Sequence, residues 1–155
     1  MPRRTTKRTV KKVAPRRAAR RAPVRRPRLE RFRSPATAAL DLPFSDAVRA
    51  VDLLFLAGQL GNRPGTLDLV PGGIAAEARQ TLENVSAVLA ASGSGLDRVV
   101  RCTVFLADIG EWAAFNRVYR EFFGAALPAR SAFAASGLAL GARVELEVIA
   151  LAGRR

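Results

Sequence analysis

Two segments with helical periodicity alternate with short runs of strand-forming residues between residues 46 and 151, and this alternation restricts the possible folds more than any other feature. The first segment, over about residues 75–91, has an apolar face made of Ala78, Leu82, Val85 and Leu89. The second, over about residues 111–123, has an aromatic face made of Trp112, Phe115, Tyr119 and Phe122. We expect both faces to be buried.

Strands are predicted on either side of these helices. They are expected over residues 46–51 and 53–58 (a hairpin), 98–106, 131–136 and 143–151. Asp108 and Glu111 form a D-x-x-E pattern that predicts a capping box at the start of the second helix. The order β-β-α-β-α-β-β predicts an α+β structure in which two helices cover one face of a sheet.

The second face of this sheet needs a cover of its own. In the last predicted strand, Val144, Leu146 and Val148 point one way, whereas Glu145 and Glu147 point the other way. The other strands are too apolar for a face that is fully exposed to water. We therefore expect the second face to meet another copy of the chain.

Charge divides the 155-residue chain into two parts. Residues 1–35 contain 15 Lys and Arg residues and a single acidic residue, Glu30, whereas residues 36–155 contain 11 Arg and 12 acidic residues. Like charges and five prolines predict a disordered basic tail over residues 1–35 and one folded domain over residues 36–155. The net charge of +13 therefore describes the tail rather than the domain.

Three interpretations of the tail stay open. It is a solvated extension (or the product of a start site placed too early), an arm that binds nucleic acid through phosphate neutralisation, or an organelle transit peptide. The last fits the arginines but not the serine content, since Ser34 is the only serine in the tail. No run of about 18 apolar residues exists, so no membrane span is expected.

The missing residue types restrict the chemistry. The chain has no histidine, and its three lysines (Lys7, Lys11 and Lys12) all lie in the tail. Serine-protease-like triads, histidine-based zinc sites and Schiff-base lysines are thereby excluded from the domain. Cys102 is the only cysteine, and we expect it to be a buried packing residue in a cytoplasmic protein. Catalysis would have to use arginine, carboxylates, hydroxyls, backbone dipoles and water.

Several short motifs, in this order and spacing, resemble the Rid family of reactive intermediate deaminases, also called the YjgF family. They run from about Leu42 to the C-terminus: Ala57-Gly58-Gln59, the loop Pro64-Gly65-Thr66 to Val70-Pro71-Gly72-Gly73-Ile74, Ala78-Arg79-Gln80-Thr81-Leu82-Glu83-Asn84-Val85, Phe105-Leu106-Ala107-Asp108, Phe115-Asn116 with Tyr119 and Phe122-Phe123, Pro128-Ala129-Arg130-Ser131, and Val144-Glu145-Leu146-Glu147. The resemblance implies a chorismate-mutase-like single-layer sheet with two helices on one face, assembled as a trimeric barrel with clefts between subunits. It also implies hydrolysis of 2-imino or 2-enamino acids to 2-keto acids and ammonia, without a metal or an organic cofactor.

The resemblance also implies site residues. Arg130 corresponds to the family's carboxylate-binding arginine, a role that suits a planar guanidinium. Glu145 corresponds to the glutamate that positions the attacking water. Asn116 matches a polar residue near the site, and Gly58 matches a glycine whose backbone approaches the ligand. Arg130 paired with a neighbour, or Glu145 and Glu147 as ordinary interface residues, stay open as purely structural alternatives.

Three further positions of the expected site depart from the family pattern. Phe44 replaces a tyrosine, Ala57 replaces a serine, and Ala132 replaces a cysteine. Each replacement removes a polar group and makes the expected cleft more apolar. The sequence therefore favours an imine deaminase of bulkier substrates, with two alternatives: a sensor or carrier of small carboxylates without catalysis, and an RNA-associated protein that acts through the tail.

Overall fold

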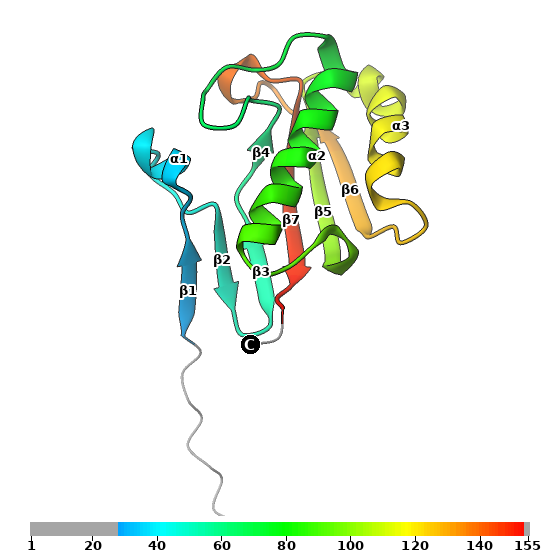
Figure 1. Cartoon of the computed structure of the whole chain (residues 1–155). Helices are drawn as coiled ribbons and strands as arrows, with labels where there is room; N and C mark the ends of the chain where they lie inside the picture. Colours follow the sequence, from blue (N-terminus) through cyan, green and yellow to red (C-terminus); the bar gives the residue numbers. More distant parts are fainter. Residues whose placement is uncertain (1–27, 154–155) are drawn as a thin grey trace, which may run out of the picture.

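The structure is a computed structural model that describes residues 28–153 (Figure 1). Seven strands form one sheet in these residues: β1 (Leu29–Phe32), β2 (Ala47–Ala50), β3 (Leu53–Leu56), β4 (Gln59–Leu60), β5 (Val99–Leu106), β6 (Ala129–Ala134) and β7 (Val144–Leu151). Their order is β1-β2-β3-β7-β5-β6, and β4 follows β3 along the edge of β7. Only the β5–β6 pair is parallel among the described strands.

Two long helices cover one face of this sheet, as predicted (Figure 1). Helix α2 (Gly73–Ala91) buries the expected stripe of Ala78, Leu82, Val85 and Leu89. Helix α3 (Trp112–Phe123) buries Phe115, Val118, Tyr119 and Phe123. The core between the helices and the sheet is completed by inward-facing strand residues: Leu54, Leu56, Cys102, Val104, Leu106, Val144, Leu146 and Val148.

Two details predicted for the start of α3 are wrong. Asp108 accepts a hydrogen bond from the Gly110 N–H and caps a short 3₁₀ turn (Ile109–Glu111) instead of α3. The carboxylate of Glu111 accepts a bond of 2.6 Å from Arg143, a charged donor that is stronger than a backbone amide. Trp112, the first residue of α3, is 47% exposed instead of buried.

The predicted boundary of the tail is also corrected. Residues 29–35 belong to the folded domain, since β1 pairs with β2 from Leu29–Ala50 to Phe32–Ala47 and Ser34 caps the short helix α1 (Pro35–Ala39). Charge counting failed here because Arg31 and Arg33 are exposed while Phe32 between them packs against the core. Residues 1–27, with the nucleic-acid arm expected there, lie outside the described residues.

The face of the sheet away from α2 and α3 is apolar and exposed in the single chain. Four large side chains on it are 36–52% exposed: Leu53, Phe55, Phe133 and Leu151. Leu53 pairs with Leu151 at one end of this face, and Phe133 pairs with Phe105 nearer the other end. We call this the open face. No helix of the described residues has the length and apolar character needed to cross a bilayer.

Candidate functional site

Glu145 lies on the open face, beside the backbone of Gly58. It sits near the start of β7, paired with Leu60 of β4 on one side and Phe105 of β5 on the other. A Cβ atom at Gly58 would overlap the Oε1 atom of Glu145. The missing side chain of Gly58 therefore makes room for this carboxylate, as expected for a glycine at a close approach.

The surroundings of Glu145 favour its protonated form. Partial burial raises the pKa of this carboxyl, and the negative charge of Glu147, two residues along the same face, raises it further. A carboxylate with a raised pKa is a better proton acceptor near neutral pH than an ordinary glutamate. The same environment makes its ionised form costly for the folded chain.

Arg130 lies on the opposite face of the sheet. It pairs with Cys102 in the parallel β5–β6 register, so its side chain points toward α3. Its Nη2 atom donates a hydrogen bond of 2.6 Å to the Oδ1 atom of Asn116. Its guanidinium carbon lies 4.6 Å from the ring centre of Tyr119 and 5.6 Å from that of Phe115. Asn116 thus fixes one edge of the guanidinium, and the two rings support its face.

The positive charge of Arg130 stays available. Within residues 28–153, no carboxylate lies within ion-pair distance of it. Its remaining N–H groups can therefore take a carboxylate from outside the chain in the two-bond geometry that guanidinium favours. The neighbour with which Arg130 pairs is the amide of Asn116, and no carboxylate of the described residues neutralises its charge.

Tyr119 and Cys102 form the buried floor under Arg130. The Tyr119 hydroxyl has no well-aligned hydrogen bond, and its neighbour is the Cys102 thiol. Burial raises the pKa of both groups, more strongly than the Arg130 charge lowers it. Both therefore stay neutral, and Cys102 is the buried packing residue that the sequence predicts. The sequence had indicated Tyr119 only as a core residue. The spacing of Phe115, Asn116 and Tyr119 within about one helical turn is the sequence pattern that could have indicated its place beside Arg130.

The three positions that depart from the family pattern divide between the two faces. Ala132 follows Arg130 on β6 and packs against the core on the same face. Ala57 precedes Gly58, and its N–H donates to the Asp46 carbonyl. Phe44 lies before β2 and is 47% exposed. The predicted site residues thus form an arginine group with Asn116 and Ala132, and a glutamate group with Gly58, Ala57 and Phe44.

These two groups do not meet within one chain. The arginine group lies between β6 and α3, and the glutamate group lies at β3, β4 and β7, with β5 between them. The side chains of Arg130 and Glu145 also point to opposite faces of the sheet. Only a second copy of the chain can bring an arginine group next to a glutamate group.

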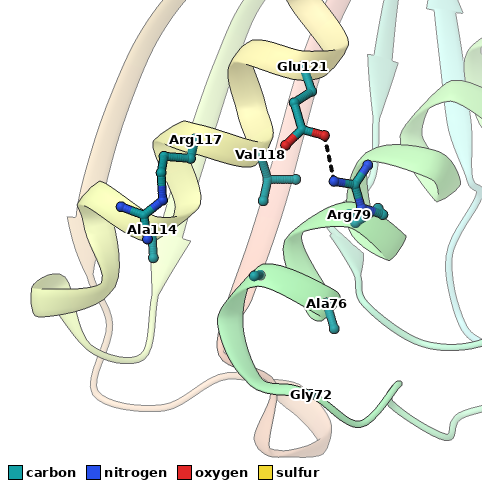
Figure 2. A pocket seen from close by; sticks show the side chains of 8 residues that line it. Gly72, Ala76, Arg79, Ala114, Arg117, Val118 and Glu121 are labelled. Carbon is teal, nitrogen blue, oxygen red and sulfur yellow. Dashed lines mark hydrogen bonds and ion pairs between the residues drawn. The ribbon is translucent and has the colours of Figure 1, made fainter.

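A hollow between α2 and α3 lies away from both groups. Figure 2 shows its lining, where Arg79 and Glu121 form an ion pair of 2.5 Å across the two helices. The hollow has a volume of about 550 Å³, and none of the predicted site residues lines it. Among the described residues, no group of three or more His, Cys, Asp and Glu side chains could hold a metal ion.

Comparison with known proteins agrees with the resemblance found in the sequence. Residues 34–152 match the family model described as endoribonuclease L-PSP. A goat (Capra hircus) protein named 2-iminobutanoate/2-iminopropanoate deaminase is 43% identical over 111 residues, which are 72% of this chain and 81% of the goat protein.

Solved structures agree as well. The yeast protein YEO7 is 41% identical with a TM-score of 0.76, over 81% of this chain and 99% of that one. The Rid family protein YyfA from Yersinia pestis is 38% identical with a TM-score of 0.68, over 71% of this chain and 88% of that one. The fold, the family match and these relatives together show that the chain belongs to the Rid (YjgF, endoribonuclease L-PSP) family.

Proposed function

We propose that the chain is a homotrimeric deaminase that hydrolyses 2-imino acids and their enamine tautomers to 2-keto acids and ammonia, in clefts between subunits. Several relatives about 40–43% identical over 111 residues carry the name of an imine deaminase, which supports an enzyme of this type. The observation that carries the proposal is the division of the site: Arg130, free of carboxylate partners, and Glu145 lie on opposite faces of one sheet.

In the proposed cleft, Arg130 binds the substrate carboxylate through two parallel hydrogen bonds. Asn116 and the rings of Tyr119 and Phe115 keep the guanidinium plane fixed. The Arg130 side chain therefore loses little conformational entropy when the substrate binds. The imine carbon is then held facing the glutamate group of the neighbouring subunit.

The neighbouring subunit's Glu145 accepts a proton from a water molecule as that water attacks the imine carbon. The C=N double bond becomes a C–N single bond, and the nitrogen takes up a proton. The carbinolamine hydroxyl then loses its proton as its C–O bond becomes C=O, the C–N bond breaks, and the leaving nitrogen takes up the proton, which releases ammonia and the 2-keto acid. The raised pKa of Glu145 suits a group that accepts and returns a proton near neutral pH.

A coupled assay, in which an amino-acid oxidase supplies imines, tests the proposal. Arg130→Ala should lower kcat/KM by about 30- to 1,000-fold, because it removes a charge-assisted pair in a partly dehydrated cleft. Glu145→Gln should lower kcat more than it weakens binding of the keto-acid product. Both variants should keep the assembly, with about three times the chain mass of 16.7 kDa in light scattering.

Subunit mixing tests the shared cleft itself. Arg130→Ala trimers and Glu145→Gln trimers should each be far less active than the wild-type trimer, but trimers refolded from an equal mixture contain clefts with both wild-type residues. Random assembly of a cyclic trimer gives roughly one such cleft in four. Each variant refolded alone is the matched control. A mixture that stays as inactive as its components, although trimers form, would contradict the shared cleft.

One observation favours a second function, a sensor or carrier that binds a small carboxylate without hydrolysing an imine. Phe44, Ala57 and Ala132 leave no polar side chain at three positions of the expected cleft. Calorimetric binding of a 2-keto acid that depends on Arg130, with no hydrolysis of any imine, would select this function over the enzyme.

A further inference from the structure

Two polar side chains of α2 hold the two backbone segments that flank Glu145. The carboxylate of Glu77 accepts a hydrogen bond of 2.8 Å from the backbone N–H of Arg143, the residue just before β7. The amide of Asn84 donates at 2.9 Å to the carbonyl oxygen of Leu60, which pairs with Glu145 in the β4–β7 register. The two side chains are seven residues apart, so they lie on the same side of α2, about two turns from each other.

Glu77 is a buried carboxylate in the face of α2 that packs on the sheet. It is 6% exposed, and among the described residues no Lys or Arg side chain forms an ion pair with it. A buried carboxylate lowers stability unless its oxygens are hydrogen-bonded, and an apolar side chain would pack here without that cost. The contribution of this carboxylate is therefore specific: it fixes the backbone at Arg143, two residues before Glu145.

Gly61 allows Glu77 to come close to the strand. A Cβ atom at Gly61 would lie 2.8 Å from the Cα atom of Glu77, too close for any other residue. Gly58 makes the same kind of room for the carboxylate of Glu145. One glycine precedes β4 and the other follows it, so this short strand lies between the two glutamates. A displacement of Glu77 would reach β4 by direct contact.

The start of β7 is also held from two other directions. The Nη1 atom of Arg143 donates a hydrogen bond of 2.6 Å to the Oε1 atom of Glu111, and the backbone carbonyl of Arg143 accepts a bond of 2.9 Å from the N–H of Ala107. With the bond to Glu77, the N–H, the carbonyl and the side chain of Arg143 are all fixed. Glu145 therefore projects from a backbone with little freedom to shift.

We infer that Glu77, together with Asn84, is a positioning residue for the proposed reaction. The two side chains hold β7 and β4 so that the carboxylate of Glu145 stays beside Gly58, where it meets the attacking water. The inference rests on the proposed function. Misplacement of a reacting group by about 1 Å can lower a rate constant by about 100-fold. Loss of the bond from Glu77 should therefore lower kcat, whereas Arg130, on β6, should bind the substrate carboxylate as before.

Two substitutions of Glu77 give a matched test. Glu77→Leu keeps a similar volume but cannot accept a hydrogen bond, so kcat should fall by about 10- to 100-fold, with less than about a twofold change in the Kd of the 2-keto acid product. Glu77→Gln keeps an oxygen acceptor for the N–H of Arg143, so kcat should stay within about threefold of the wild-type value. Glu83→Leu, at an exposed position of the same helix, is the control and should change neither value.

The titration of Glu145 separates positioning from a loss of folded protein, and it needs no turnover. NMR can follow its carboxyl carbon in a chain that contains isotope-labelled glutamate, with the signal assigned by its loss in Glu145→Gln. Partial burial and the charge of Glu147 raise the pKa of Glu145. A carboxylate that Glu77→Leu displaces into water should therefore titrate at lower pH than in the wild-type chain. An unfolded fraction would lower activity without moving this titration in the folded chains.

Asn84→Leu provides an independent variant, because it removes the hold on Leu60 instead of the hold on Arg143. If Glu77→Leu chains do not fold, this variant should still move the titration of Glu145 to lower pH. An unchanged titration in the folded variants, or a loss of keto-acid binding as large as the loss of kcat, would overturn the inference and leave the deaminase standing. A wild-type chain that hydrolyses no imine would overturn the proposed function instead, and the titration would still decide whether α2 positions this carboxylate.

Discussion

Removal of β1 should destabilise the domain measurably, although its sequence is rich in arginine. The comparison is between a chain that begins at Arg28 and one that begins at Ser34, so that the difference reports residues 28–33 alone. The shorter chain keeps Ser34, whose hydroxyl accepts from the N–H of Thr37 and caps α1. It loses the four pairs of β1 with β2 and the contact of Phe32 with the core.

The expected magnitude follows from these contacts. Net stabilisation by backbone hydrogen bonds, about 0.5–1.5 kcal/mol each, is largely offset by about 1–2 kcal/mol per residue of backbone entropy. The burial of Phe32 is left as the main contribution, about 2 kcal/mol for a side chain that is only partly buried. At about 4 °C per kcal/mol for a domain of this size, the thermal midpoint should fall by about 8 °C.

Thermal unfolding followed by circular dichroism, at equal chain concentration, measures this shift, since assembly makes the midpoint depend on concentration. Phe32→Ala in the longer chain should reproduce most of the loss, whereas Leu29→Ala, at an exposed position of the same strand, should have little effect. Equal midpoints for the two truncations would refute the conclusion that β1 is part of the folded domain.

Four further predictions concern the site. Glu147→Gln removes the charge that helps to raise the pKa of Glu145. A protonated Glu145 cannot act as a base, so the acid limb of the kcat/KM–pH profile should move to lower pH in this variant. An unchanged profile would contradict the electrostatic coupling of the two glutamates. Because the folded state favours protonated Glu145, the ionised group lowers the stability of the folded chain as pH rises above its ordinary pKa. Glu145→Gln should therefore raise the thermal midpoint at about pH 7, and this gain should vanish near about pH 4. Melting curves at both pH values measure the difference. Gly58→Ala should displace the Glu145 carboxylate and reduce kcat without loss of folding, measured by turnover and circular dichroism together, and an unchanged kcat would contradict the close approach. Tyr119→Leu should raise KM for imines more than Tyr119→Phe does, because Phe keeps the ring under Arg130, and equal effects would assign Tyr119 to packing alone.

The local parts of this fold could be predicted from the sequence, and the long-range parts could not. Helical spacing identified α2 and its buried stripe, and alternation identified the two faces of β7, because both patterns are complete within one segment. β1 was missed since two of its four residues, Glu30 and Arg31, are charged and the strand lies within a strongly basic stretch.

The site shows the same limit. The resemblance supplied Arg130 and Glu145 one by one, but their placement on opposite faces depends on the register of β5 with β6 and with β7. A slip of one residue in either pairing would reverse the face of a side chain, and no local pattern fixes that register. A cavity of about 830 Å³ beside Gly58 is also beyond the sequence, because residues from β1, α1, β4, α2 and several separate loops line it.

The position of β7 has a consequence for the way this chain is made. β7 follows every other described strand along the chain, yet it lies in the middle of the sheet, hydrogen-bonded to β3, β4 and β5. Until residues 144–151 have left the ribosome, the β1-β2-β3 ribbon and the β5–β6 pair have no strand to join them. Between the completion of β6 and the arrival of β7, the growing chain therefore carries two unfinished sheet edges and an uncovered apolar face, a state open to capture by chaperones or to aggregation. Folding should finish in one late step, when the C-terminal strand closes the sheet between two halves that were made before it.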